Sequence, residues 1–289
     1  MSRIVCWFSH GAASTVATKL KIEENNKSPE PKELIVVSIY IKDEHEDNAR
    51  FRADCEKWFG QEIVTITNDK YKSSVSEVIK QTKYMSGVNG ARCTKELKKQ
   101  VRWDWQRLDD IHVFGMTSEE ESRIDDLIDN EPNAIFDAPL IDAGYSKQDC
   151  FKLVEEQCIK LPEMYQLGFP NNNCIGCLKV SSVGYWNLIR IHFPKIFWQR
   201  AREEELLGIA MCNMSTMKLI NKHPDVIIMI ASDIKSGKLK QIKIKPQDGQ
   251  MRIPLRYLPE GVGIKDPIYV PDCGFFCETD NSAIPITLK

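Results

Sequence analysis

Two cysteines separated by two residues stand out in this sequence as candidates for metal or redox chemistry. Cys174 and Cys177 enclose Ile175 and Gly176, in a stretch rich in Asn and Gly that can turn both sulfurs toward one point. A Cys-x-x-Cys pair is typical of a zinc site, an iron–sulfur cluster or a redox disulfide. No second Cys-x-x-Cys occurs in the sequence, so any further ligand must come from another part of the chain.

A third cysteine is a candidate partner for this pair. Cys93 directly precedes a strongly charged segment, residues 94–107, which we expect to be a helix. The positive end of a helix dipole would stabilise the thiolate of Cys93. Thiolate ligands suit iron–sulfur clusters and zinc alike, so the spacing leaves a cluster, zinc and no metal as alternatives.

The second candidate site is a loop of small residues near the N-terminus. Residues 9–14, Ser-His-Gly-Ala-Ala-Ser, separate an expected buried strand at 3–8 from an expected helix at 15–25. A helix N-terminus presents unpaired N–H groups, and small residues let an anion approach them. Ser9, Gly11 and Ser14 therefore predict a phosphate site. The alternative is an ordinary strand-to-helix turn with Ser14 as the N-cap.

The elements that would position these residues alternate between strand and helix. Strands are expected at 34–41, 62–67 and 111–115, and helices at 47–59, 74–83, 94–107 and 118–129. This order predicts an α/β fold with a mostly parallel sheet covered by helices on both faces. Ligands of such folds bind outside the carboxyl ends of the strands. Residues 1–145 would form this nucleotide-binding domain.

The alternation of strands and helices is not expected to continue beyond residue 145. Residues 146–223 are expected to be a mostly helical region carrying the Cys-x-x-Cys loop, and residues 224–289 a small appendage and tail. Short strands or extended segments are expected in the appendage, because Pro residues would break any helix there. They are placed at 226–231, 240–245 and 251–255.

Composition limits the class of protein. The chain has 289 residues, a net charge of −2, 42% hydrophobic residues and ten cysteines, but neither a signal-peptide pattern nor an apolar run long enough for a membrane span. We expect a cytoplasmic protein with no membrane partner, in which disulfides explain few of the cysteines. The oligomeric state is not predicted.

The small-residue loop also carries a resemblance to a known family. Residues 8–16, Phe-Ser-His-Gly-Ala-Ala-Ser-Thr-Val, resemble the phosphate loop of the phosphoadenosine phosphosulfate (PAPS) reductase family, which has the adenine nucleotide alpha-hydrolase-like (PP-loop) fold. ATP pyrophosphatases of this fold carry Ser-Gly-Gly-Lys-Asp-Ser, whereas Ala12 and Ala13 stand at the Lys and Asp positions here. The resemblance continues through residues 44–51, 115–123, 139–140, 161–162 and 168–169.

The resemblance implies an adenine nucleotide site built from these segments. Its implied residues are Ser9, Gly11, Ser14, His45, Gly115 and Arg123. From the residues alone, His45 could equally be a histidine of a surface loop and Arg123 a solvated arginine.

The order of the cysteines is similar to the cluster-binding pattern of adenylyl sulfate reductases. Those enzymes have two adjacent cysteines at the first position, whereas Cys93 is followed by Thr94. The resemblance implies a 4Fe–4S cluster held by Cys93, Cys174 and Cys177, with a fourth ligand from Cys277 or Cys273, or an open iron. Zinc is the alternative metal.

The C-terminal segment resembles another part of sulfonucleotide reductases. Asp272-Cys273-Gly274 is similar to the Glu-Cys-Gly tail that carries their nucleophilic cysteine, which implies a catalytic Cys273. Cys273 and Cys277 could instead form a disulfide, bind the metal or be structural. The other five cysteines, at positions 6, 55, 150, 158 and 212, are interpreted as packing residues.

Three functions follow. The first is a sulfonucleotide reductase-like oxidoreductase of sulfur metabolism, in which Cys273 attacks sulfur and a thioredoxin-like reductant releases sulfite. The second is an ATP-dependent sulfur-transfer enzyme acting on tRNA or DNA, and the third a non-catalytic nucleotide-binding protein. Aromatic and basic residues at 184–198 could hold a nucleic acid strand. The helix expected at 94–107 has one basic face that could steer an anionic nucleotide or RNA, formed by Lys95, Lys98, Lys99, Arg102 and Arg107. They could equally be packing residues and a solvated helix face.

Overall fold

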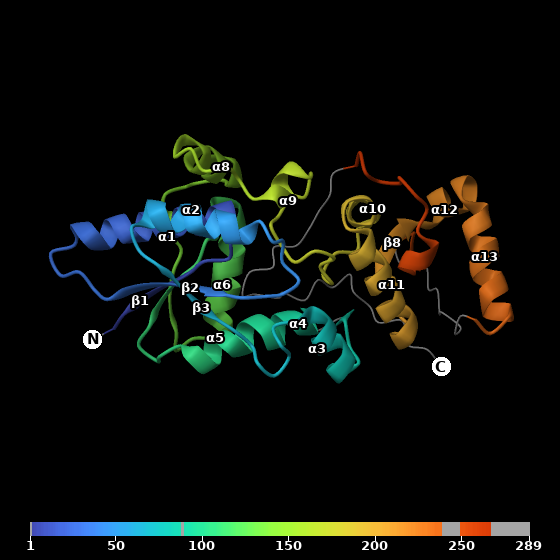
Figure 1. Cartoon of the computed structure of the whole chain (residues 1–289), viewed down its shortest axis with the longest axis horizontal. Coiled ribbons are helices and arrows are strands. Elements are labelled where there is room, and N and C mark those ends of the chain that lie inside the picture. The colour runs from blue at the N-terminus through green and yellow to red at the C-terminus, as the bar shows by residue number, and fades with distance from the viewer. Residues whose placement is uncertain (1, 88–89, 239–248, 267–289) are drawn as a thin grey trace. The chain divides into compact units, whose positions relative to one another are not determined.

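The computed structural model describes residues 2–87, 90–238 and 249–266. Within these, the chain forms two compact units (Figure 1). Unit 1 contains residues 2–75 and 95–172, and unit 2 contains residues 76–94 and 173–266. The predicted fourth ligand and nucleophile, Cys277 and Cys273, lie outside the described residues, as does the predicted extended segment at 240–245.

Unit 1 is built on a five-stranded sheet in which every neighbouring pair of strands is parallel. The strand order is β3-β2-β1-β6-β7. The strands are β1 (Ile4–Trp7), β2 (Leu34–Ile39), β3 (Ile63–Ile66), β6 (Ile111–Val113) and β7 (Ile135–Asp137). Ile4 pairs with Leu34 on one side and with Ile111 on the other, so β1 is the central strand. The predicted α/β fold with a mostly parallel sheet is confirmed.

Helices cover both faces of this sheet because the central strand is apolar on both faces. Ile4, Cys6 and Phe8 point into the core shared with helices α1 and α2. On the opposite face, Trp105 of α5 contacts two residues. The guanidinium of Arg3 lies 4.4 Å from the Trp105 ring, and the centroids of the Trp7 and Trp105 rings are 5.8 Å apart. Figure 1 shows α1 and α2 on one side of the sheet and α5 on the other. The helical segments of unit 1 are α1 (Ala12–Lys27), α2 (Asn48–Phe59), a π-helical segment (Lys95–Lys99), α5 (Gln100–Trp105), a 3-10 turn (Ser118–Glu120), α6 (Glu121–Asn130), α7 (Pro139–Asp142), α8 (Lys147–Glu156) and α9 (Glu163–Gln166).

The helix expected at 94–107 differs from the prediction. It starts as α4 (Arg92–Thr94), passes through the π-helical segment and continues as α5. A π-turn inserts a residue relative to the α-helical repeat, so residues beyond it change face. Lys98 and Arg102, expected on an exposed basic face, are both buried and pair with Glu44 and Glu131. The interpretation of this face as a solvated surface is therefore wrong for these two residues.

Unit 2 combines helices with two short antiparallel ribbons. Its elements are α3 (Val75–Thr82, which begins at the last residue of unit 1), β4 (Ser86–Gly87), β5 (Gly90–Ala91), α4, α10 (Val183–His192), α11 (Pro194–Leu207), β8 (Cys212–Ser215), α12 (Thr216–Lys222), α13 (Pro224–Lys235), β9 (Gln250–Ile253) and a 3-10 turn (Leu255–Tyr257). Strands β8 and β9 pair antiparallel.

One predicted strand of this unit is a helix. Residues 226–231, expected to be extended, belong to α13, and β8 was not predicted. The β-branched residues favour a strand locally, but Pro224 at the first helical position starts a helix and Val226 and Ile230 fall on one buried face. Tertiary burial outweighs strand propensity at this point.

Candidate nucleotide and sulfur sites

The small-residue loop leads from the carboxyl end of the central strand into the first helix. Helix α1 begins at Ala12, three residues earlier than expected, and its N-cap is Gly11, which makes no side-chain capping bond. The N–H groups of this first turn therefore lie within the loop itself. Because β1 lies between β2 and β6, the loop occupies the point where the strand order reverses, the ligand-binding position of open parallel sheets. The arrangement suits an anion such as a phosphate.

Ser14 closes the loop from inside the helix. Its hydroxyl donates to the Gly11 carbonyl at 3.0 Å and accepts the N–H of Ser9 at 3.1 Å. The Ser9 hydroxyl lies 3.0 Å from the Ser14 hydroxyl. Ser14 is thus the third residue of the helix and not its N-cap, and the two hydroxyls predicted to line the phosphate site are brought together.

Gly115 supports the same turn from the neighbouring strand. A Cβ atom at this position would lie 2.4 Å from both the Cα and the N atom of Ser14, and 2.7 Å from the carbonyl carbon of Ala13. Only glycine allows the segment after β6 to approach the first turn of α1 so closely. The structure therefore brings Ser9, Gly11, Ser14 and Gly115 together, and their role toward a phosphate stays a prediction.

His10 lies in this loop in a strained and buried conformation. Its backbone φ is 60°, a value that residues other than glycine rarely adopt, and the residue is buried. The ring Nδ1 lies 3.4 Å from Glu44 Oε2 and Nε2 lies 3.3 Å from Ser38 Oγ. The Asn172 side chain donates to the His10 carbonyl at 2.7 Å. Strain held in place by several polar partners is typical of functional loops.

Glu44 is the centre of a buried polar network beside the loop. Besides His10, it accepts a hydrogen bond from the Asn48 side chain at 3.0 Å, and Lys98 Nζ lies 3.9 Å away. Asn172 also donates to Asn48 at 2.8 Å. The sequence analysis singled out neighbouring His45 and missed this network. The sequence did offer a signal for Glu44, because this residue lies in the segment 44–51 that carries the family resemblance. It offered none for Lys98, because the π-helical segment that contains Lys98 was predicted as a regular helix.

His45 and Arg123 take part in local contacts. The Nδ1 atom of His45 accepts the Asp47 N–H at 3.1 Å, at the entry to α2, and Arg123 forms an ion pair with Glu120. Their role toward a nucleotide stays a prediction.

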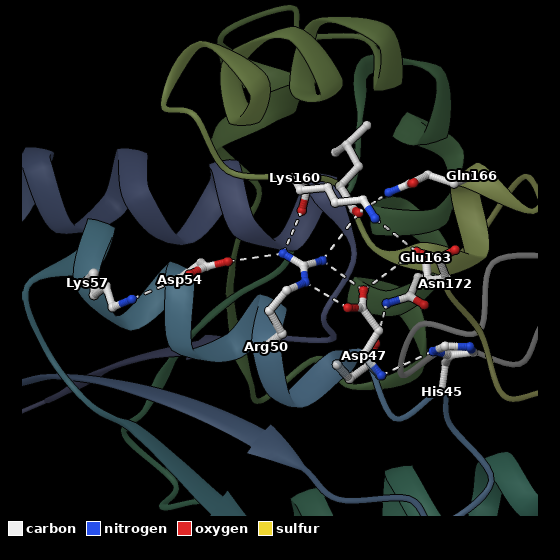
Figure 2. Close-up of polar contacts among 11 residues, drawn as sticks. His45, Asp47, Arg50, Asp54, Lys57, Lys160, Glu163, Gln166 and Asn172 are labelled. Carbon is white, nitrogen blue, oxygen red and sulfur yellow. Dashed lines mark hydrogen bonds and ion pairs between the residues drawn. The ribbon is translucent and has the colours of Figure 1, made fainter.

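Arg50 fixes the start of α2 to a distant segment of the chain (Figure 2). Its guanidinium binds Asp47 at 2.7 Å, Asp54 at 3.0 Å and the carbonyl of Lys160 at 3.0 Å. Asp47 also accepts the Glu163 N–H at 2.9 Å, and the hydrogen bond from Arg50 lowers the pKa of the Asp47 carboxyl. These contacts join the start of α2 to residues 160–163.

The three cysteines predicted to bind a metal all belong to unit 2, and all three are buried. Tyr185 of α10 fixes the turn between Cys174 and Cys177. Its hydroxyl accepts the Cys177 N–H at 2.8 Å and lies 3.4 Å from the Cys174 carbonyl, to which it donates. Burial raises the pKa of Tyr185 well above its ordinary value, so the hydroxyl keeps its proton at neutral pH.

A buried arginine supports the same turn from α11. Gly176 adopts φ 69°, and its carbonyl accepts a hydrogen bond from Arg200 Nε at 3.3 Å. Arg200 also binds Ser76 at 2.8 Å and Glu203 at 2.7 Å. The Cys-x-x-Cys turn is therefore held by side chains from two helices.

The cysteine set is only partly described. Among the residues that the structure describes, no group of three or more His, Cys, Asp or Glu side chains is arranged to hold a metal ion. The donor chemistry of the three cysteines suits an iron–sulfur cluster or zinc.

Four of the remaining cysteines are buried, as expected for packing residues. Burial raises the pKa of Cys55 and Cys150 to about 12, and raises those of Cys6 and Cys212 as well, so these thiols stay protonated. Cys158 is an exception, because it is exposed just beyond the end of α8, with φ 57°. Its interpretation as a packing residue is wrong.

The aromatic residues at 184–198 are mostly buried. Tyr185, Trp186 and Phe197 are fully covered, and the Trp186 indole donates to the Val180 carbonyl at 2.7 Å. These rings cannot stack on a nucleic acid, so the packing interpretation holds for them. Within the described residues, no helix is long and apolar enough to cross a bilayer.

Comparison with known proteins gives no family assignment. No family model matches the chain, and no curated protein matches it. Among solved structures, the U34-tRNA thiolase NcsA from Methanococcus maripaludis, with its 4Fe–4S cluster, is similar over 71% of this chain and 72% of its own. The identity is 13% and the TM-score 0.37, which establishes neither a shared fold nor a shared activity. What this chain's own structure defines is an α/β protein with a small-residue loop at the switch point of a parallel sheet.

Proposed function

We propose that this protein is an adenine nucleotide-dependent sulfur-transfer enzyme that uses ATP to activate a nucleic acid acceptor. The observation that carries the proposal is the loop of residues 9–14, which presents the uncapped first turn of α1 at the switch point of the sheet. Positive helix ends at this position favour phosphate groups.

A positive side chain near the loop supports ATP as the ligand. The loop itself has no lysine, since Ala12 and Ala13 occupy the first helical turn. Lys98, brought in by the π-helical segment, lies 3.9 Å from Glu44, which in turn contacts His10 of the loop. Lys98 could therefore supply the charge that the loop lacks, once a nucleotide competes with Glu44 for it.

The thiols of unit 2 support sulfur chemistry. Cys93, Cys174 and Cys177 are buried in one unit, and the Cys-x-x-Cys turn is held by Tyr185 and Arg200. A 4Fe–4S cluster is the proposed cofactor and zinc the alternative. A bound cluster with one iron not ligated by cysteine would supply a binding site for the sulfur that is transferred.

Sulfonucleotide reduction is the second candidate, and one observation favours it. The first turn of α1 contains no charged side chain of the kind that ATP pyrophosphatases place there. In this reaction the Cys273 thiolate would attack the sulfur of a sulfonucleotide and displace the nucleotide, and a thioredoxin-like thiol would then release sulfite. Cys273 lies outside the described residues.

The two candidates differ in their products. Protein prepared without oxygen would be given ATP or adenylyl sulfate, each with and without nucleic acid. Pyrophosphate release from ATP that requires nucleic acid supports the proposal, and sulfite release from adenylyl sulfate that Cys273→Ser abolishes replaces it with reduction. Nucleotide-dependent thermal stabilisation with neither product would indicate a binding protein.

A matched pair of variants would connect either product to the loop. Ser14→Ala removes the hydroxyl that closes the loop, and Ser236→Ala removes an exposed hydroxyl of unit 2 as the control. Only the first change is expected to weaken nucleotide binding.

A further inference from the structure

The C-terminal half of unit 2 contains a small fold that neither candidate site uses. Its elements follow the order β8, α12, α13, β9, and β8 and β9 pair antiparallel, with Met214 opposite Met251. The core shared by β8, α12, α13, β9 and the 3-10 turn after β9 comprises Met214, Leu219, Val226, Ile230, Ile253 and Tyr257. Two consecutive helices, joined at His223 and placed between the two paired strands in the sequence, have the element order of the strand–helix–helix–strand part of a winged helix-turn-helix.

Helix α13 occupies the recognition-helix position of this arrangement, and one of its faces is exposed. Val226 and Ile230 are buried in the core. Asp225, Ile228, Ser232 and Lys235 recur at helical spacing on the opposite side, and all are exposed. Ile228 has 67% of its surface exposed, so an apolar side chain stands in the middle of this face. Figure 1 shows α13 beside α12 within this unit.

The two helices and the residues that directly follow α13 carry a small excess of positive charge. Exposed lysines occur at positions 218, 222, 235 and 238, against aspartates at 225 and 233. Lys218 lies 3.8 Å from Asp266, and Lys238 lies 3.8 Å from Asp233. Lys222 and Lys235 form no ion pair with any residue that the structure describes. The charge is local, because the whole chain has a net charge of −2.

We infer that this face binds B-form DNA, with α13 in the major groove and the lysines of α12 on phosphates. The inference rests on the proposed function and names the acceptor as duplex DNA. A helix fits the major groove of B-DNA, whereas the major groove of duplex RNA is too narrow and deep to be read this way. Ile228 and the neighbouring exposed Met229 suit contact with thymine methyl groups.

The placement fits the proposed chemistry. The helix pair belongs to the same unit as Cys93, Cys174 and Cys177. DNA held by α12 and α13 would thus be bound by the unit that carries the thiols. The lysine side chains would set affinity and salt dependence, and the apolar residues of α13 would set preference among sequences.

The test measures binding of the full chain to labelled duplex DNA and to tRNA by fluorescence anisotropy, without nucleotide, over a series of salt concentrations. The double variant Lys222→Ala/Lys235→Ala would be compared with Lys57→Ala/Lys152→Ala, which removes two exposed lysines of unit 1. We expect duplex binding to weaken about tenfold in the first variant only, with the salt slope reduced by about 2.

Three outcomes would overturn the inference. They are tighter binding of tRNA than of duplex DNA, equal effects of the two double variants, and absence of salt-dependent binding. If Ile228→Gln changes the oligomeric mass and not DNA binding, the face is a protein interface. Because the assay contains no nucleotide, loss of DNA binding and failure of ATP-dependent product release are separate results.

Discussion

Gly115 lies directly against the backbone of Ser14, so the segment after β6 and the first turn of α1 share a space that excludes a side chain. A Cβ atom at position 115 would lie 2.4 Å from the Cα and N atoms of Ser14. At position 11, by contrast, a Cβ would meet only the Tyr165 hydroxyl at 3.4 Å and the Ser9 hydroxyl at 3.7 Å. The proposed phosphate loop is therefore held in shape from the neighbouring strand.

Gly115→Ala is expected to destabilise the protein by about 1–3 kcal/mol, because the backbone of α1 must shift to admit a methyl group. Nucleotide binding should weaken as well. Gly11→Ala is the matched control and should change stability by less than about 1 kcal/mol. Denaturant unfolding would measure both. Equal stability of the Gly115→Ala variant and the wild type would show that the close approach is not a constraint.

Lys98→Ala is expected to reduce ATP binding about tenfold and to destabilise the protein by roughly 1–3 kcal/mol, because it leaves the buried Glu44 carboxylate without this cation. Lys95→Ala provides the control, because Lys95 is exposed on the same π-helical segment. The thermal shift produced by ATP would measure affinity. A shift that is unchanged in Lys98→Ala would remove Lys98 from the nucleotide site.

Metal analysis of protein prepared without oxygen tests the cofactor. We expect iron with an equal amount of acid-labile sulfide, lost in Cys174→Ala and retained in Cys158→Ala, because Cys158 is exposed and lies in the other unit. Zinc without sulfide would make the site structural. Iron that persists in Cys174→Ala would place the cluster elsewhere.

The sheet could be predicted because its strands are short apolar runs. The central strand is buried on both faces, and a strand of this kind is recognised in the sequence by a continuous apolar run, here residues 4–8. The loop could be predicted for a related reason, since its small residues follow that strand directly.

The polar network could not be predicted because it depends on geometry that the sequence does not display. Lys98 lies near Glu44 on a segment that is π-helical and not α-helical, and His10 is buried with a backbone φ of 60°. The strand prediction for residues 226–231 failed for another reason. Their β-branched side chains favour a strand, but their buried positions recur with a helical period. Local propensity thus predicted the sheet and failed where tertiary contacts select the conformation.

Glu204 is expected to make unit 2 less stable as pH rises. Its carboxyl group is buried and accepts the N–H groups of Met211 and Leu255, each at 2.6 Å, which joins α11 to the residue before β8 and to the turn after β9. Burial raises the pKa of Glu204 to about 8, so the folded chain keeps the proton at neutral pH. The unfolded chain loses this proton above its ordinary pKa of about 4.5.

Between these two pKa values the folded state binds more protons than the unfolded state, so stability falls as pH increases, by up to about 1.4 kcal/mol per pH unit. Glu204→Gln removes the titrating group and should remove this contribution between about pH 5 and pH 8, although it also loses one hydrogen-bond acceptor worth about 1 kcal/mol. Glu205→Gln, at the neighbouring and more exposed position, should leave the slope unchanged. Urea unfolding at several pH values would measure it, and an identical slope in the wild type and Glu204→Gln would mean that Glu204 is ionised in the folded protein.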